Sequence, residues 1–230
     1  MSQPIFFTTA LLHKKMLSQD IMELRFERPV NFTFLAGQFV QFQVPFQGST
    51  LLRPYSMSSA LQDEYLEFCV KILPEGKASK LFLALMSGDA VHISSAQGVF
   101  ICRSDHRSKK MFIATGTGLA PIISMIEDRL ERAGNEKLSL LFGVRFPEDV
   151  FWTDRLDEIQ GSYNNFKYQL TLSRPSDVWA GLRGRVSEHL SHLPHEAEYY
   201  ICGSVEMVKN VRSLLIAHGV DTKSIHFEIF

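Results

Sequence analysis

A short glycine-rich segment, residues 116–121, has the composition of a phosphate-binding turn. It reads Gly-Thr-Gly-Leu-Ala-Pro and lies between an apolar run, residues 111–114, and a stretch of helical periodicity, residues 120–133. Glycine lets the backbone approach a phosphate closely, and a helix N-terminus offers unpaired N–H groups and the positive end of a dipole. The segment departs from the dinucleotide-binding fingerprint, because Pro121 replaces the third glycine and Glu136 precedes the second strand. A tight strand-to-helix turn that binds nothing explains these residues equally well.

A second polar segment, residues 53–59, reads Arg-Pro-Tyr-Ser-Met-Ser-Ser and follows a run of strand character. Arg53 can bind a phosphate through a forked pair of N–H groups, Tyr55 offers a flat ring for stacking, and the serine hydroxyls can donate to a ring nitrogen. Residues 76–79, Gly-Lys-Ala-Ser, form another candidate anion site at a helix start, although Ser79 is equally explained as a plain N-cap. Taken alone, residues 53–59 indicate an exposed turn.

The elements that must position these residues differ between the two halves of the chain. In the N-terminal half, Val, Phe and Val alternate with two glutamines over residues 40–44, which is typical of a half-buried strand. Residues 65–73 and 90–93 repeat this pattern between turn residues, so we expect a small antiparallel barrel. One helix is predicted from about residue 79 to residue 86, ending at Ser-Gly-Asp.

In the C-terminal half, predicted strands alternate with predicted helices, which indicates a parallel sheet. The strands are expected at residues 111–114, 138–142, 168–172 and 199–201, and the helices at residues 120–133, 154–159, 186–193 and 205–218. A polar stretch, residues 103–110, separates the two patterns and reads as a linker, or else as a basic docking site for an acidic carrier protein. We therefore predict two domains, residues 1–104 and 105–230.

Composition excludes several classes of function. The 230 residues carry 24 Lys and Arg against 25 Asp and Glu, so the chain lacks the net positive field of most nucleic-acid or membrane-surface binders. The 3 cysteines, Cys69, Cys102 and Cys202, are too few for a disulfide framework or for the four thiolates of a plant-type iron–sulfur cluster. No apolar run approaches the roughly 18 residues of a membrane span. We expect a cytoplasmic protein that binds no nucleic acid and does not insert into a membrane.

A histidine-rich stretch near residue 190 does not predict a metal site. It contains His189, His192 and His195, with Glu188 one helical turn before His192. Pro194 breaks the helical spacing, and the pattern matches no zinc signature. We expect no metal and a solvated helix end.

Taken together, the polar segments resemble those of the plant-type ferredoxin:NADP oxidoreductases and their relatives. Residues 53–56 match the R-x-Y-S flavin motif of that family, residues 76–79 its pyrophosphate motif, and residues 116–121 its G-T-G-x-A-P loop. Cys202-Gly203 matches the C-G near its C-terminus, and residues 36–38 and 98–100 are lesser matches. The resemblance spans nearly the whole chain in the family's order. It implies an FAD-binding antiparallel Greek-key β-barrel followed by an α/β nicotinamide-binding domain with a parallel sheet.

The resemblance also implies roles for individual residues. Arg53 would bind the FAD pyrophosphate, Tyr55 would pack on the isoalloxazine, and Ser56 would lie near the flavin nitrogen that receives the hydride. Further FAD contacts are implied for Pro54, Lys71, Ile72, Gly76, Lys77, Ala78 and Ser79. Contacts to the nicotinamide dinucleotide are implied for Thr115, Gly116, Thr117, Gly118, Pro121, Arg145, Ser173, Arg174, Cys202 and Gly203.

The last residues of the chain complete the expected catalytic set, which consists of Ser56, Cys202, Glu228 and Phe230. By the resemblance, Phe230 would stack over the isoalloxazine and swing aside for the nicotinamide, Glu228 would handle protons, and Cys202 would lie against the nicotinamide ring. The alternatives are a final edge strand whose aromatic is tucked into the core and a small buried cysteine at a strand end. Ser204 replaces the proline that usually follows C-G, and residues 95–98 lack the family's proline, so both loops depart from the pattern.

The expected activity is that of an FAD-dependent NAD(P)H oxidoreductase that exchanges electrons with a one-electron carrier such as ferredoxin or flavodoxin. Any iron–sulfur cluster would lie on that partner, and the reductase itself is expected to be a monomer. Arg174 favours NADP slightly, whereas residues 173–175 with Trp179 and Gly181 also resemble NADH-dependent oxygenase reductases. Two alternatives remain: a reductase that uses free flavin as a substrate, and a non-catalytic electron-transfer subunit.

Overall fold

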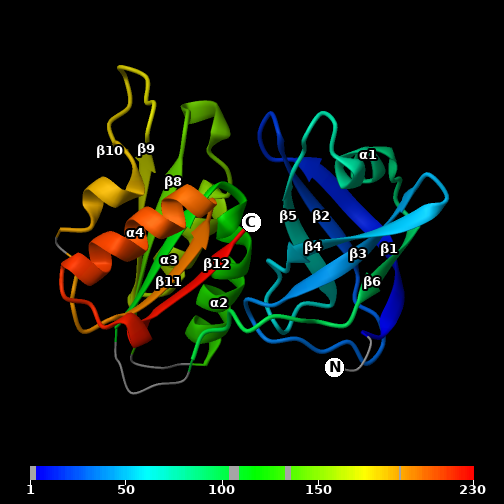
Figure 1. The fold of residues 1–230 in the computed structure, drawn as a ribbon, viewed down its shortest axis with the longest axis horizontal. Coiled ribbons are helices and arrows are strands. Elements are labelled where there is room, and N and C mark those ends of the chain that lie inside the picture. The colour runs from blue at the N-terminus through cyan, green and yellow to red at the C-terminus, as the bar shows by residue number, and fades with distance from the viewer. Residues whose placement is uncertain (1–3, 104–108, 133–135, 192) are drawn as a thin grey trace.

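The computed structural model describes residues 4–103, 109–132, 136–191 and 193–230, and within them two sheets lie side by side (Figure 1). The strands of the first sheet are β1 (Phe6–Met16), β2 (Ile21–Glu27), β3 (Phe39–Phe46), β4 (Ser49–Ser56), β5 (Tyr65–Lys71) and β6 (Ala90–Ser94). Those of the second are β7 (Lys109–Thr115), β8 (Lys137–Val144), β9 (Phe166–Leu172), β10 (Leu182–Arg183), β11 (Glu198–Gly203) and β12 (Ile225–Ile229).

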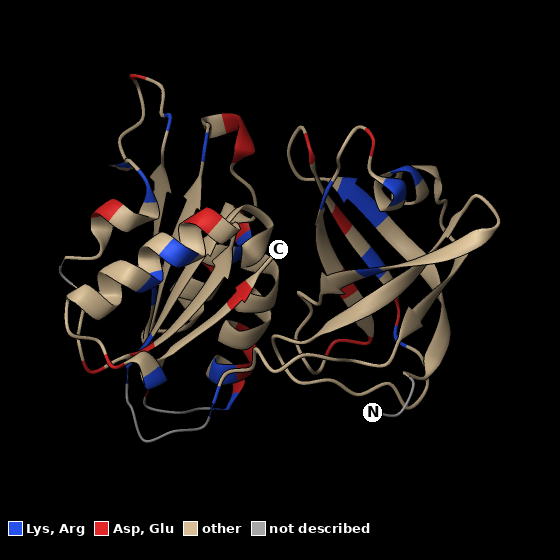
Figure 2. Ribbon diagram, in the orientation of Figure 1, with Lys and Arg blue, Asp and Glu red and all other residues tan. Residues whose placement is uncertain are grey.

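Helices accompany both sheets. The α-helices are α1 (Lys77–Ala84), α2 (Leu119–Glu131), α3 (Thr153–Ser162) and α4 (Val205–Ala217). The 3₁₀ helices are η1 (Gly116–Gly118), η2 (Pro147–Asp149), η3 (Val186–His189) and η4 (Thr222–Ser224). Acidic and basic positions are scattered over both domains (Figure 2), as the net charge of -1 leads one to expect.

The first sheet is antiparallel, in the order β4-β3-β6-β1-β2-β5. Its β2–β5 and β3–β6 pairs join strands that are not consecutive, as in a Greek key. An antiparallel bridge between Met57 and Phe68 brings the end of β4 against β5, so the sheet curls into a barrel. The predicted alternation in β3 is confirmed, because Val40, Phe42 and Val44 are buried. Phe42 contacts the rings of Phe68 and of Phe82 on α1.

The second sheet is parallel, in the order β10-β9-β8-β7-β11-β12. Alternate residues of β7 face opposite layers: Phe112 and Ala114 pack with α2 and α3, whereas Met111 and Ile113 pack with α4. The strand order reverses at β7, because β8 lies on one side of it and β11 on the other. Ligands of open α/β sheets bind outside the carboxyl ends of the strands at such a reversal. The two-domain fold class predicted from the sequence is confirmed.

Several predicted boundaries were wrong. The helix expected from residue 79 begins at Lys77 and ends at Ala84, and its N-cap is Gly76 instead of Ser79. The helix expected over residues 186–193 is the short η3, followed by a turn in which the amide of Leu193 donates to the carbonyl of Leu190. Pro194 follows directly, and the residue before a proline is disfavoured in the α conformation.

The region between the domains also differs from the expected linker. Strand β7 begins at Lys109, and the side chain of Lys110 is fully buried with its ammonium 3.6 Å from Glu136. The predicted boundary between residues 104 and 105, and most of the basic stretch, lie outside the described residues, so the boundary stays a prediction.

His192 of the histidine-rich stretch is likewise not described. In the part of the chain that is described, no group of three or more His, Cys, Asp or Glu side chains could hold a metal ion. No described helix is long and apolar enough to cross a membrane.

Candidate functional site

The carboxyl ends of β7 and β11 meet at the reversal of strand order. Residues 116–118, which were predicted to turn around a phosphate, form η1 directly after β7. Gly116 has a φ of 53°, a conformation that favours glycine, and a Cβ added there would meet no atom within 4 Å. Gly118 lies against β11, where an added Cβ would come within 2.3 Å of the carbonyl oxygen of Cys202. The turn is therefore open on one side and tightly packed on the other.

The end of the barrel strand β4 faces the end of β12 across the two domains. The hydroxyl of Ser56 donates to Oε1 of Glu228 over 3.0 Å. In the β11–β12 ladder, Glu228 pairs with Cys202, so three of the four expected catalytic residues form one cluster. Burial raises the pKa of Glu228, although its hydrogen bond with Ser56 opposes that shift. Burial, and then the nearby Glu228, raise the pKa of the Cys202 thiol, which stays protonated at neutral pH.

The C-terminal residue, Phe230, lies at the same place. The chain end lies between the two domains (Figure 1), and the amide of Phe230 donates to the carbonyl of Gly203 over 3.4 Å. Strand β12 is an edge strand of the sheet, as the alternative interpretation expected. However, 62% of Phe230 is exposed, so its ring is not tucked into the core. The ring is thus available to cover a bound ligand.

The barrel presents a cationic cradle at the start of α1. The N-cap of this helix is Gly76, which has no side chain to form a capping bond, so amides of the first turn are left for another acceptor. Ser79 lies inside the first turn, is buried, and accepts a hydrogen bond from the amide of Leu73. A Cβ added at Gly76 would lie 2.5 Å from that hydroxyl oxygen, so a residue larger than glycine would clash at this position. The ammonium of Lys77 lies 4.3 Å above the ring of Phe46.

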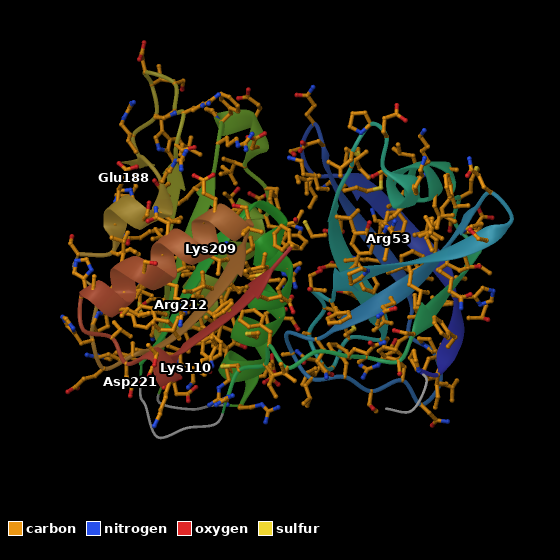
Figure 3. The ribbon with its side chains drawn as sticks, viewed as in Figure 1. Arg53, Lys110, Glu188, Lys209, Arg212 and Asp221 are labelled. Atoms are coloured by element: carbon orange, nitrogen blue, oxygen red, sulfur yellow. The ribbon has the colours of Figure 1, made fainter. Side chains whose placement is uncertain are left out.

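Residues of β4 and β5 complete the barrel side of the site. Arg53 (Figure 3) and the next residue, Pro54, are exposed on β4. A guanidinium N–H of Arg53 donates to the neighbouring carbonyl of Leu52. The half-buried ring of Tyr55 is held by edge contacts to Phe42 and Phe82, and burial raises its pKa.

The end of β5 was also expected to contact FAD. The ammonium of Lys71 pairs with Asp20 over 2.8 Å, and the amide of Ile72 donates to the carbonyl of Asp20. These two residues are therefore tied to the turn between β1 and β2, and the Ile72 amide is engaged by the protein itself.

The second domain places three further predicted residues together. Arg145 follows β8, and Ser173 and Arg174 follow β9. Backbone hydrogen bonds from Ser173 to Val144 and from Arg174 to Arg145 join the two segments. Both arginines are exposed, and within the described residues neither forms an ion pair with a carboxylate. Pro121, in contrast, is buried in the first turn of α2 and shapes the turn instead of lining an open surface.

The site as a whole suits an anionic dinucleotide. An uncapped helix N-terminus with Lys77 beside it and an exposed arginine nearby favour a pyrophosphate. The glycine turn after β7 offers a second backbone approach for phosphate. These residues fit FAD on the barrel side and a nicotinamide dinucleotide on the other.

Comparison with known proteins agrees with this assignment. Residues 8–101 match the family model described as the oxidoreductase FAD-binding domain, and residues 112–213 match the oxidoreductase NAD-binding domain. The chain is 32% identical to ferredoxin–NADP reductase B of Sorangium cellulosum (strain So ce56), over 96% of each chain. It belongs to the ferredoxin–NADP reductase family of FAD- and NAD(P)H-dependent oxidoreductases.

Two further relatives illustrate the range of this reductase family. The toluate 1,2-dioxygenase electron transfer component of Pseudomonas putida is 29% identical over 100% of this chain and 69% of its own length. The solved ferredoxin NADP+ reductase of Neisseria gonorrhoeae, with bound FAD and NADP, superposes with a TM-score of 0.86 at 25% identity, covering 97% of this chain and 98% of its own. The predicted family, fold, cofactors and oxidoreductase class are confirmed.

A group of residues that no sequence motif indicates joins the domains beside the site. Ser124, Trp152 and Arg155 of the nicotinamide domain bind residues of the barrel. Their signal in the sequence is weak, because each lies on or beside a helix whose pattern is explained by amphipathicity alone.

Proposed function

We propose that this reductase takes electrons from NADPH or NADH and delivers them to a separate one-electron carrier protein, such as a ferredoxin or a flavodoxin. The observation that carries the proposal is the Ser56–Glu228 hydrogen bond, which joins the flavin motif of the barrel to the end of the nicotinamide domain. FAD supplies the chemistry that converts a two-electron donor into one-electron steps. The described part of the chain holds too few cysteines for a cluster of its own, and relatives named as ferredoxin reductases and oxygenase components support an external acceptor.

The protein's own residues bind, orient and protect the reacting groups. Arg53, Lys77 and the first turn of α1 hold the FAD pyrophosphate, and Tyr55 supports the ring system. Cys202 presents a neutral, buried thiol beside the nicotinamide position. Burial raises the pKa of Glu228, so its carboxyl can hold a proton at a higher pH than an exposed glutamate can, while Oε1 accepts the hydrogen bond from the Ser56 hydroxyl.

An anaerobic titration tests this function. The purified protein should retain yellow FAD, which NADPH or NADH should bleach, and added ferredoxin or flavodoxin should then recover the colour. Bleaching by neither coenzyme would contradict the proposal. A colourless protein that turns over added riboflavin would instead show a reductase of free flavin, and bound FAD that NAD(P)H does not reduce would show a non-catalytic subunit.

Coenzyme preference is proposed to depend on the exposed arginines after β8 and β9. Charge-assisted hydrogen bonds to a 2′-phosphate contribute about 1.5–3 kcal/mol, which corresponds to about 10- to 100-fold in affinity. Arg174→Ala should therefore raise the KM for NADPH by about 10- to 100-fold and leave the KM for NADH unchanged. Steady-state kinetics with both coenzymes measure this, with Arg132→Ala as the control, because Arg132 pairs with Asp128 on α2. An unchanged preference in Arg174→Ala would remove Arg174 from coenzyme selection, and the same test applies to Arg145.

The exposed ring of Phe230 is proposed to occupy the nicotinamide position. Since stacking of an aromatic ring contributes about 0.5–1.5 kcal/mol, Phe230→Ser should tighten NADP+ binding by about two- to tenfold. Titration followed by difference absorbance of the flavin measures the affinity. Phe227→Ser is the matched control, because Phe227 lies three residues earlier on β12 beside Arg212 of α4. Unchanged affinity and flavin-reduction rate in Phe230→Ser would exclude a gate.

We also propose that the reductase is a cytoplasmic monomer. The free thiols Cys69, Cys102 and Cys202 suit a reducing compartment. Sedimentation at micromolar concentration tests the oligomeric state.

A further inference from the structure

The nicotinamide domain holds the flavin motif at three successive points. Ser56 donates to Glu228, the carbonyl of Ser58 accepts from Nη2 of Arg155 over 3.1 Å, and the carbonyl of Ser59 accepts from the hydroxyl of Ser124 over 2.7 Å. The first contact belongs to the site already described. The other two come from α3 and α2, so we name Arg155 and Ser124 the interdomain clamp.

All three guanidinium nitrogens of Arg155 form hydrogen bonds, and their partners lie in both domains. Its Nη1 lies 2.6 Å from Oε1 of Glu67 on β5, and its Nε and Nη2 each lie 2.8 Å from the carboxylate of Glu127 on α2. Burial alone would lower the pKa of Arg155, but the bonds to Glu127 and Glu67 outweigh it and raise the pKa. The guanidinium is therefore permanently charged and fixed in a bidentate geometry that lysine cannot reproduce.

Glu67 is held in turn from the barrel side. Its side chain is 1% exposed and pairs with Arg25 over 2.9 Å as well as with Arg155. The hydroxyl of Ser58 donates to the same Oε1 that Arg155 binds. One arginine from each domain binds one oxygen of this buried carboxylate, so separating the domains would remove the Arg155 partner of Oε1, and loss of a buried charged partner is costly.

A residue beside the clamp has an unfavourable backbone conformation. Trp152, just before α3, has a φ of 56°, which costs a non-glycine residue of order 1 kcal/mol. Its indole N–H donates to Glu23 of β2 over 2.9 Å, and the guanidinium of Arg155 lies 5.0 Å from its ring centroid. The contacts across the interface thus hold Trp152 in a conformation that the isolated domain would not favour.

The clamp lies outside the cofactor site. Arg155, Glu67 and Trp152 line an open interdomain groove of about 820 Å³. Among the described residues that line it, none belongs to the proposed FAD or nicotinamide contacts. Arg155 therefore contacts none of the proposed cofactor residues and can affect the reaction only indirectly, through partners such as Ser58 of the flavin segment.

We propose that Arg155, assisted by Ser124, is a positioning residue that sets the distance between the flavin-binding segment and the nicotinamide domain. This inference rests on the proposed function. Reaction between two bound groups depends steeply on their separation, and a misplacement of about 1 Å can cost about 100-fold in rate. Loosening the clamp should slow reduction of bound FAD by NADPH without weakening the binding of either group.

Stopped-flow kinetics under anaerobic conditions test the clamp. Arg155→Met should lower the limiting rate of FAD reduction by about tenfold or more, and Arg155→Lys should lower it less, with the dissociation constants of FAD and NADPH changed less than twofold. Reoxidation of dithionite-reduced protein by ferricyanide should keep the wild-type rate, because it does not use the nicotinamide domain. Arg132→Met, directly after α2, is the matched control and should react like wild type.

Two additions keep the test decisive. Ser124→Ala removes a single hydroxyl, so it should fold even if Arg155→Met does not, and we expect about a threefold slower reduction. Spin labels at the exposed Ala90 of β6 and Ser213 of α4, with Cys102→Ser as background, report the interdomain distance without any cofactor. The distance distribution should broaden in the clamp variants.

If Ser124→Ala and every folded Arg155 variant keep the wild-type rate of FAD reduction and an unchanged distance distribution, the proposed positioning role of the clamp is wrong. Failure of the wild type itself to be bleached by NAD(P)H would contradict the proposed function, while the label distances would still report on the clamp.

Discussion

Gly118→Ala is expected to slow the reduction of bound FAD by NADPH about 100-fold while FAD stays bound to the barrel. Gly118 has helical dihedrals, so alanine is conformationally acceptable there. The obstacle is space, because the new Cβ would lie 2.3 Å from the carbonyl oxygen and 2.6 Å from the carbonyl carbon of Cys202. Backbone atoms cannot rotate away as a flexible side chain can, so η1 and the end of β11 must move apart.

The displacement would occur where the nicotinamide is proposed to lie. Overpacking of this kind costs about 1–3 kcal/mol in stability, which thermal unfolding measures alongside stopped-flow reduction. Gly161→Ala is the matched control, because Gly161 lies on α3 with no atom within 4 Å of an added Cβ. That control should be neutral or slightly stabilising, by about 0.5–1 kcal/mol. If Gly118→Ala reduces its FAD at the wild-type rate, the turn after β7 does not position the coenzyme.

Much of this site could be predicted from the sequence, because the contacts that form it are between residues close together in the chain. The glycines of η1, the start of α1 and the Cys202-Gly203 pair are short motifs whose spacing reflects backbone geometry. Parallel strands bring their carboxyl ends to one edge, so the alternation of strands and helices puts residues 116–118 and residue 202 at the same edge, whereas the pairing of β7 with β11 that makes them neighbours is known only from the structure. The alternation in β3 likewise predicted which face of the strand is buried.

The rest depends on contacts between distant segments, which local patterns do not encode. Arg155 meets Ser58 and Glu67 only after both domains have folded, and nothing in the amphipathic pattern of α3 distinguishes it from a solvated arginine. The buried Lys110 looked like part of a polar linker, because its partner Glu136 lies beyond a whole helix in the sequence. The sequence also did not reveal what Ser79 does: its hydroxyl accepts a hydrogen bond from the amide of Leu73 in the preceding turn, instead of capping the helix.

Arg53→Met is expected to weaken FAD binding by about 10- to 100-fold, as the loss of one charge-assisted interaction with a phosphate predicts. Arg53 is exposed on β4 and donates a hydrogen bond to the carbonyl of the neighbouring Leu52, so its removal breaks no ion pair among the described residues. The fold should therefore survive, which makes the effect on FAD interpretable. Methionine keeps the unbranched, apolar part of the side chain on the strand surface.

Titration of the apoprotein with FAD, followed by quenching of flavin fluorescence, measures the affinity. Lys80→Met is the matched control, because it removes the same charge from a basic residue on α1 whose ammonium pairs with Glu75 over 3.0 Å. If only the net positive charge matters, both variants should lose FAD affinity equally, and added salt should reduce that loss. If Arg53 makes a specific forked contact with the phosphate, only Arg53→Met should lose affinity. Equal affinities in Arg53→Met and wild type would show that the pyrophosphate is held by the helix N-terminus and Lys77 without Arg53. The first turn of α1 would then be the main anion site of the barrel.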